Sequence, residues 1–258
     1  MTNNDQAGKS MSHGLKAGVA AMAEVTILGN LMDVMKMEKQ RNCRKTYYQI
    51  ADKLMYRGFL RANFIGLFPW GLSMYGVRGA GYGVGSSLGK DLLERTTLGE
   101  SSQAIVASGM GGGLEGALTT PLSMMRTRVA QAQGGRATFD VRTVVKSAPI
   151  SSCKRACDWM LRTAVYSSLR NRWNDNVAAF AAGVASAVIT IPIDRLLPLM
   201  QQTNPPKRIV QALVADASTK GISAFMAGTT MRVLHGGWHT CFVFGALKLF
   251  ETEKRISY

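Results

Sequence analysis

Three short segments of the chain repeat one arrangement, in which two positions a helical turn apart can carry an acid and a base. The three pairs of positions are Asp33 with Lys36, Ser123 with Arg126, and Asp194 with Leu197. A spacing of three residues puts both side chains on one face of a helix. The second and third segments begin with Pro121 and Pro192, and Leu31 stands at that position in the first. The repetition predicts three equivalent helix ends that can be joined by charge.

Each of these segments closes a long apolar stretch. Apolar stretches cover residues 14–35, 62–89, 101–125, 176–200 and 224–250. A helix of about 20 residues crosses the ~30 Å hydrocarbon layer of a bilayer, and each stretch is long enough to do so. The chain is 47% hydrophobic, only 18% charged and rich in glycine. The pattern predicts membrane helices that pack closely or line a polar interior.

The net charge of +15 raises the alternative of a soluble protein that binds nucleic acid. Such a protein would have to bury all five apolar stretches in one small globule, so we do not expect nucleic acid as a partner. The four cysteines lack the paired spacing of a zinc site, and no metal site is predicted. We find neither a phosphate-binding loop nor a hydrolytic triad, and an enzyme is not expected.

The repeated segments resemble the signature of the mitochondrial carrier family, Pro-x-Asp/Glu-x-x-Lys/Arg. This resemblance implies an all-α membrane protein of three tandem helix-pair repeats, which form a six-helix pseudo-threefold bundle with short matrix helices. The repeats would cover residues 1–98, 99–175 and 176–258. Tyr56-Arg57-Gly58 resembles a lipid-binding motif of the family, at which a helix N-terminus binds a phosphate, and it implies bound cardiolipin. A simple turn that begins a helix is the alternative explanation of this motif.

In the family, the base of each signature pairs with the acid of another repeat and closes a gate on the matrix side. The contacts implied here are Asp33 with Arg126, Lys36 with Asp194, and Ser123 with Leu197. The third contact has lost both of its charges, which avoids a single unpaired charge in a medium of low dielectric constant. Leu31 replaces the proline expected to bend the first helix. A gate on the cytoplasmic side survives only as Asp175, Glu251 and Lys254.

The substrate-contact positions of the family fall on the even-numbered helices. Here they correspond to Gly66, Arg162 and His235, with Asn63 and Arg232 one turn earlier. An arginine at membrane depth needs water or an anion, so Arg162 and Arg232 suit a small carboxylate or phosphate. The alternative is that they pair with an internal acid such as Glu24 or Glu115. The numerous glycines at spacings of three and four residues are interpreted as close helix contacts.

More than half of the 31 basic residues lie in the three connections within the repeats. This bias predicts that the connections face the matrix, with both termini in the intermembrane space of the inner mitochondrial membrane. The basic surface favours anionic lipids.

Two functions remain. The first is transport of a small anionic metabolite by alternating access. The second is a carrier-like structural subunit of a large inner-membrane assembly, such as a respiratory chain complex, and the incomplete gates favour it. The two stay open at this point.

Overall fold

The computed structural model describes most of the chain. The described residues are 16, 18–41, 45–56, 67–131, 138–201, 211, 214, 215, 218, 221 and 228–256. Of the residues named above, Asn63, Gly66, Arg57 and Gly58 lie outside this set. The side chains of Glu251 and Lys254 lie outside it as well.

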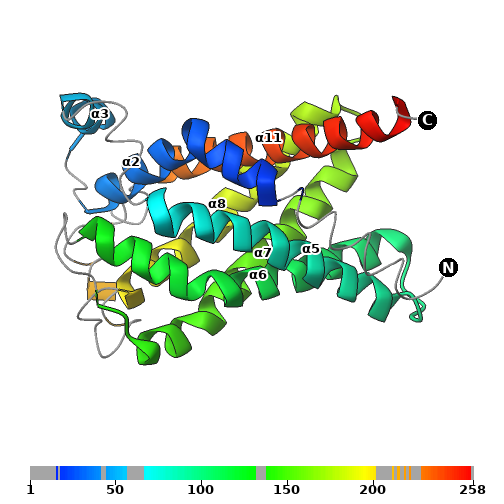
Figure 1. Cartoon of the computed structure of the whole chain (residues 1–258), viewed down its shortest axis with the longest axis horizontal. Coiled ribbons are helices and arrows are strands. Elements are labelled where there is room, and N and C mark those ends of the chain that lie inside the picture. Colours follow the sequence, from blue (N-terminus) through cyan, green and yellow to red (C-terminus); the bar gives the residue numbers. More distant parts are fainter. Residues whose placement is uncertain are drawn as a thin grey trace.

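The described residues form helices and no strands (Figure 1). The first helix runs from residue 18 through a π-helical turn, η1 (Val25–Gly29), into α2 (Asn30–Arg41). The remaining elements are α3 (Tyr47–Tyr56), the π-helical turn η2 (Leu67–Gly71), α5 (Leu72–Leu93), α6 (Glu100–Gln131), α7 (Val141–Leu169), α8 (Asp175–Gln201) and α11 (Thr229–Ile256).

Each long helix packs against the helix that follows it in the chain. Contacts run from α5 to α6, from α6 to α7, from α7 to α8 and from α8 to α11. Helix α11 then packs against α2, and the two lie side by side in Figure 1. Residue Gly18 meets Gly76 of α5, so the first helix also contacts its successor. The chain therefore closes on itself, with its first and last described helices in contact.

Glycines lie where these helices approach most closely, as the sequence predicts. A β-carbon added at Gly85 of α5 would come within 2.9 Å of the α-carbon of Gly111 on α6. A β-carbon at Gly116 of α6 would come within 2.6 Å of the carbonyl oxygen of Ser151 on α7. Small residues let backbones approach, and dispersion contacts between helices then replace a hydrophobic driving force that is absent in lipid.

The distribution of polarity is the reverse of that in a water-soluble protein. Leu88, Val188 and Ile189 are 50% or more exposed, while Glu24, Glu115 and Asp158 are at most 1% exposed. A large apolar exterior around a charged interior suits a protein whose surroundings are lipid. The segment Gly18–Lys36 is the one described helix that is both long and apolar enough, by length and composition, to cross a membrane.

The five apolar stretches coincide with helices over their described parts, although α6 extends six residues past its stretch to Gln131. Helix α7 coincides with none of the apolar stretches. It carries Lys146, Lys154, Arg155, Asp158 and Arg162, which interrupt its hydrophobic pattern. Four of these five side chains are buried or half-buried against neighbouring helices. Hydropathy alone therefore does not reveal α7, because the charged residues of this helix are buried in the bundle.

Candidate functional site

Two of the three contacts implied between the repeated segments are present. The Arg126 guanidinium lies 3.0 Å from the Asp33 carboxylate and joins α6 to α2. The Lys36 ammonium lies 3.5 Å from the Asp194 carboxylate and joins α2 to α8. The Tyr75 hydroxyl on α5 donates a further hydrogen bond of 2.9 Å to Asp33. Side chains from four helices therefore meet at this end of the molecule.

The third position is joined by a neutral hydrogen bond. The amide of Gln201, one turn beyond Leu197 on α8, donates to the Ser123 hydroxyl at 2.9 Å. The Ser123 hydroxyl itself donates to the Thr120 carbonyl oxygen of its own helix. Leu197 is half-buried. Where we predicted a contact of Ser123 with Leu197, the structure has a polar contact that leaves no charge unpaired.

Arg232 of α11 has two acidic partners. Its guanidinium lies 2.9 Å from Asp158 of α7 and 2.7 Å from Asp194 of α8. Lys154 of α7 also pairs with Asp194. The alternative considered from the sequence, that Arg232 pairs with an internal acid, holds in the structure, but the acids are Asp158 and Asp194 and not Glu24 or Glu115. One arginine holds three helices together.

Arg162 of α7 differs from Arg232 because its contacts in the described part of the chain are neutral. Its Nε donates to the Ser186 hydroxyl on α8 at 3.0 Å, and its guanidinium stacks 5.2 Å from the ring centre of Trp159. The side chain is 2% exposed. A buried guanidinium has five N–H donors, so these contacts leave donors available to an anion.

Glu115 of α6 is the centre of a second group of charges. Arg78 of α5 lies 3.0 Å from its carboxylate, and Arg155 of α7 lies 3.4 Å from it. The indole N–H of Trp159 donates to the other carboxylate oxygen at 2.6 Å. Arg155 also approaches Asp158 within 3.9 Å and so links this group to the partners of Arg232.

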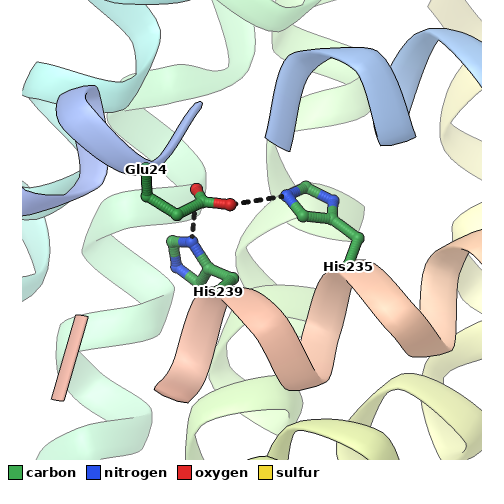
Figure 2. Close-up of side chains that lie close together, drawn as sticks. All are labelled: Glu24, His235 and His239. Atoms are coloured by element: carbon green, nitrogen blue, oxygen red, sulfur yellow. Dashed lines mark hydrogen bonds and ion pairs between the residues drawn. The ribbon is translucent and has the colours of Figure 1, made fainter. Parts of the chain in front are cut away.

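Glu24, on the first helix, contacts two histidines of α11 (Figure 2). Its carboxylate lies 3.0 Å from Nδ1 of His239 and 3.6 Å from Nε2 of His235. The other ring nitrogen of His235, Nδ1, lies 3.1 Å from Asp33. His235 is therefore enclosed by two carboxylates of the first helix.

The π-helical turn explains how both carboxylates reach one histidine. Glu24 and Asp33 are nine residues apart, and in a regular α-helix of about 3.6 residues per turn they would lie on opposite faces. The turn Val25–Gly29 lies between them and holds an additional residue. That residue rotates Glu24 toward the face of Asp33. It also distorts the helix just before Leu31, where the family's proline is missing.

The charged residues described above form what we call the interior charge network. Its bases are Lys36, Arg78, Arg126, Lys154, Arg155, Arg162 and Arg232, and its acids are Glu24, Asp33, Glu115, Asp158 and Asp194. Bases outnumber acids by two when the histidines are neutral. An interior of this kind attracts anions.

Comparison with known protein families matches residues 169–254 to the family described as mitochondrial carrier protein. The match covers α8, α11 and the segment between them, including Asp194, Arg232 and both histidines of α11. This third of the chain is therefore similar to mitochondrial carrier proteins. Proteins of that family are generally transporters of the inner mitochondrial membrane. Comparison with curated proteins found no match.

The residues with which we associated a cytoplasmic gate are only partly described. Asp175 is exposed at the start of α8 and accepts a hydrogen bond of 3.3 Å from the Tyr166 hydroxyl of α7. Glu251 and Lys254 belong to α11, with side chains outside the described residues. Of the lipid-binding motif, Tyr56 is described. It is the last residue of α3 and is 93% exposed.

The sequence analysis named Arg162 and His235 but missed Lys154, Asp158 and His239. Lys154, Asp158 and Arg162 follow one another at four-residue spacing, which places opposite charges on one face of α7. His235 and His239 have the same spacing on α11. That spacing is visible in the sequence. The partners of these residues on other helices cannot be found from the sequence, because they depend on how each helix is rotated.

Proposed function

We propose that this protein carries a small anionic metabolite across the inner mitochondrial membrane by alternating access. The observation that supports this most is the excess of buried bases over buried acids, together with Arg162, whose described contacts are neutral. A small carboxylate or phosphate would supply the missing negative charge. An arginine can bind either group through two parallel hydrogen bonds.

The proposed architecture is the three-repeat, six-helix pseudo-threefold bundle, with repeats at residues 1–98, 99–175 and 176–258. The packing of each long helix on its successor, and of α11 on α2, supports this arrangement. The family match over 169–254 corresponds closely to the third repeat. Helix α3 would be a short matrix helix of the first repeat.

The contacts of Asp33 with Arg126 and of Lys36 with Asp194 would form the matrix gate, with Ser123 and Leu197 at its uncharged third position. The described conformation would then be closed toward the matrix. Asp175, Glu251 and Lys254 would be what remains of the opposite gate. Alternating access requires the two closed states to have similar free energies, so substrate binding must weaken the matrix contacts.

The proposed substrate contacts are Arg162, Arg232 and His235, with Asn63 and Gly66 on the even-numbered helix of the first repeat. Arg162 would bind the anion directly. Arg232 is bound to Asp158 and Asp194, and an anion that reached it would compete with these acids. Such competition would couple binding to the gate, because Asp194 also binds Lys36.

The basic connections would face the matrix, and both termini would face the intermembrane space. Anionic lipids, cardiolipin in particular, would bind at the matrix surface, and Tyr56, Arg57 and Gly58 would contribute to one such site. The exposure of Tyr56 at the end of α3 is compatible with contact to a lipid headgroup.

Uptake into liposomes tests the transport proposal. The purified protein is reconstituted into liposomes that are loaded with small carboxylates or phosphate. Exchange across the liposome membrane is then measured for wild type and for Arg162→Ala. We expect wild-type exchange of at least one anion and its loss in the variant. Arg172→Ala, in the exposed turn after α7, is the matched control and should exchange at the wild-type rate. Unchanged exchange in Arg162→Ala would remove Arg162 from the substrate site.

A second candidate function, a structural subunit of a large inner-membrane assembly, is supported by the neutral contact of Ser123 with Gln201 in place of a gate ion pair. Native gel electrophoresis of gently solubilised mitochondrial membranes separates the two functions. Migration near the mass of the free chain with detergent would favour the carrier. Stable migration with a complex many times larger would favour the subunit.

A further inference from the structure

The cluster of Glu24, His235 and His239 has a composition that ion pairing alone does not explain. One carboxylate oxygen and one ring nitrogen from each histidine lie within 4.8 Å of one another. The side chains come from the first helix and from α11 and point toward a common centre (Figure 2). All three residues are buried, with exposures of 0%, 5% and 8%.

Two polar atoms of this cluster have no hydrogen-bond partner. They are Oε1 of Glu24 and Nε2 of His235, which lie 3.6 Å apart, beyond hydrogen-bond distance. Within the described part of the chain, the Glu24 carboxylate contacts the two imidazoles and no lysine or arginine. A buried carboxylate of this kind is costly unless a cation neutralises it. The unpaired atoms therefore indicate a positively charged ligand that accepts lone pairs from nitrogen and oxygen.

We propose that Glu24, His235 and His239 bind a divalent first-row transition-metal ion such as Zn²⁺. The ligands are a carboxylate oxygen of Glu24, Nε2 of His235 and Nδ1 of His239, and a fourth position stays open for water or another ligand. Two imidazoles and a carboxylate are a common ligand set for zinc and related ions. Magnesium and calcium prefer sites made of oxygen alone, so they do not compete at this site.

Asp33 contacts the ring nitrogen of His235 that does not face Glu24. Its carboxylate lies 3.1 Å from Nδ1 of His235, while Nε2 of the same ring faces Glu24. A metal-binding histidine usually presents its second nitrogen to a carboxylate, which fixes the tautomer and orients the ring. Asp33, His235 and Glu24 would thus form, with the metal, the series carboxylate, histidine, metal, carboxylate.

The distances require little movement. Zinc binds nitrogen and oxygen at about 2.0–2.2 Å, so tetrahedral ligands lie roughly 3.3 Å apart. The Glu24 oxygens already lie 3.0 and 3.6 Å from the two histidine nitrogens. Rotation of the His235 and His239 rings would bring their nitrogens closer. A bound ion would join the first helix to the last, and this role does not depend on transport.

The experiment uses the full-length protein in detergent, purified through a tag that contains no histidine and stripped with a chelator. The protein is equilibrated with micromolar free Zn²⁺, separated from unbound metal and analysed for zinc. We expect one tightly held ion per chain that excess Mg²⁺ does not displace. The variants Glu24→Gln and His239→Gln should lose it.

Two controls exclude other ligands in the chain. His13→Gln changes the remaining histidine of the sequence, and Cys153→Ser with Cys157→Ser removes the thiols on α7. Both should retain one zinc per chain. X-ray absorption of the zinc-loaded wild type needs no variant to fold, and it should show two imidazoles and no sulfur at about 2.3 Å. Absence of tightly bound zinc, sulfur ligation, or full retention by well-folded Glu24→Gln and His239→Gln would overturn the proposal.

Discussion

Four acids of the interior charge network bind bases that come from other helices, namely Asp33, Glu115, Asp158 and Asp194. Asp33 of α2 binds Arg126 of α6, and Asp194 of α8 binds bases from α2, α7 and α11. A buried charge that loses its partner keeps the cost of leaving water and gains nothing in return. Each of these residues therefore fixes the position of a helix that is distant in sequence.

The pair of Asp33 and Arg126 provides a test of this account. Asp33→Asn or Arg126→Gln should each destabilise the protein by up to about 3–5 kcal/mol, because each removes the oppositely charged partner 3.0 Å from a buried group. The double variant should lose less free energy of unfolding than the two single variants lose together. Thermal unfolding in detergent, followed with a thiol-reactive dye, gives the comparison. Lys53→Gln breaks the more exposed pair with Glu38, 3.4 Å apart, and should cost less than about 1 kcal/mol. Additive losses in the double variant would contradict a buried pair.

The stability of the first turn of α7, outside the membrane-spanning part, should depend on pH through Asp140. Its carboxylate begins α7 by accepting hydrogen bonds from the Thr143 hydroxyl and the Arg142 backbone N–H. These bonds, that of Thr143 first, hold the pKa of Asp140 below its usual value. The stabilisation is complete above the unfolded pKa of about 3.9 and disappears as pH falls through the lower folded value. Hydrogen exchange at the first turn of α7 should therefore be faster in Asp140→Ala than in wild type at pH 7. The difference should shrink in strong acid, and a constant difference would contradict this origin.

At the scale of the element, glycine decides how close neighbouring helices lie. The β-carbon missing at Gly85 leaves space for the backbone of Gly111, while Gly113 of α6 faces open space. A side chain at Gly85 would therefore collide with the neighbouring helix, whereas a side chain at Gly113 would not.

Gly85→Ala should lower the melting temperature in detergent, because the new methyl group forces α5 and α6 apart at a cost of about 1–3 kcal/mol. Gly113→Ala is the matched control in the neighbouring helix. Its new methyl group meets nothing within 4 Å, and alanine favours the helix by up to about 1 kcal/mol. Its melting temperature should stay level or rise. Equal effects of the two substitutions would show that the interface does not limit stability.

Particular elements also show what the sequence could reveal. The repeated segments at Asp33, Arg126 and Asp194 were predictable from their spacing, although their helices continue to residues 41, 131 and 201. Helix α7 was not identified as an apolar span, because hydropathy cannot distinguish charges that are buried in a bundle from charges in water. The meeting of Glu24 with His235 depends on the π-helical turn between Glu24 and Asp33. No residue type encodes that turn, so this part of the site needed the structure.

At the scale of the whole molecule, the apolar exterior and charged interior specify how the protein partitions. Carbonate or high salt removes proteins held to a membrane by surface charge, but it does not remove helices surrounded by lipid. We expect this protein to remain in the membrane pellet after carbonate extraction of mitochondria and to enter solution only with detergent. A peripheral protein of the inner membrane serves as the control that is released. Release of this chain by carbonate would contradict its place within the bilayer.

The position of α11 at the end of the chain has a consequence for biogenesis. Arg232, His235 and His239 arrive last during synthesis and import, and they are partners of Glu24, Asp33, Asp158 and Asp194. Until α11 inserts, these acids lack those partners in an apolar environment. A nascent chain that stops before residue 228 would therefore be held by chaperones or degraded, and insertion of the last helix would be the step that commits the chain to its folded state.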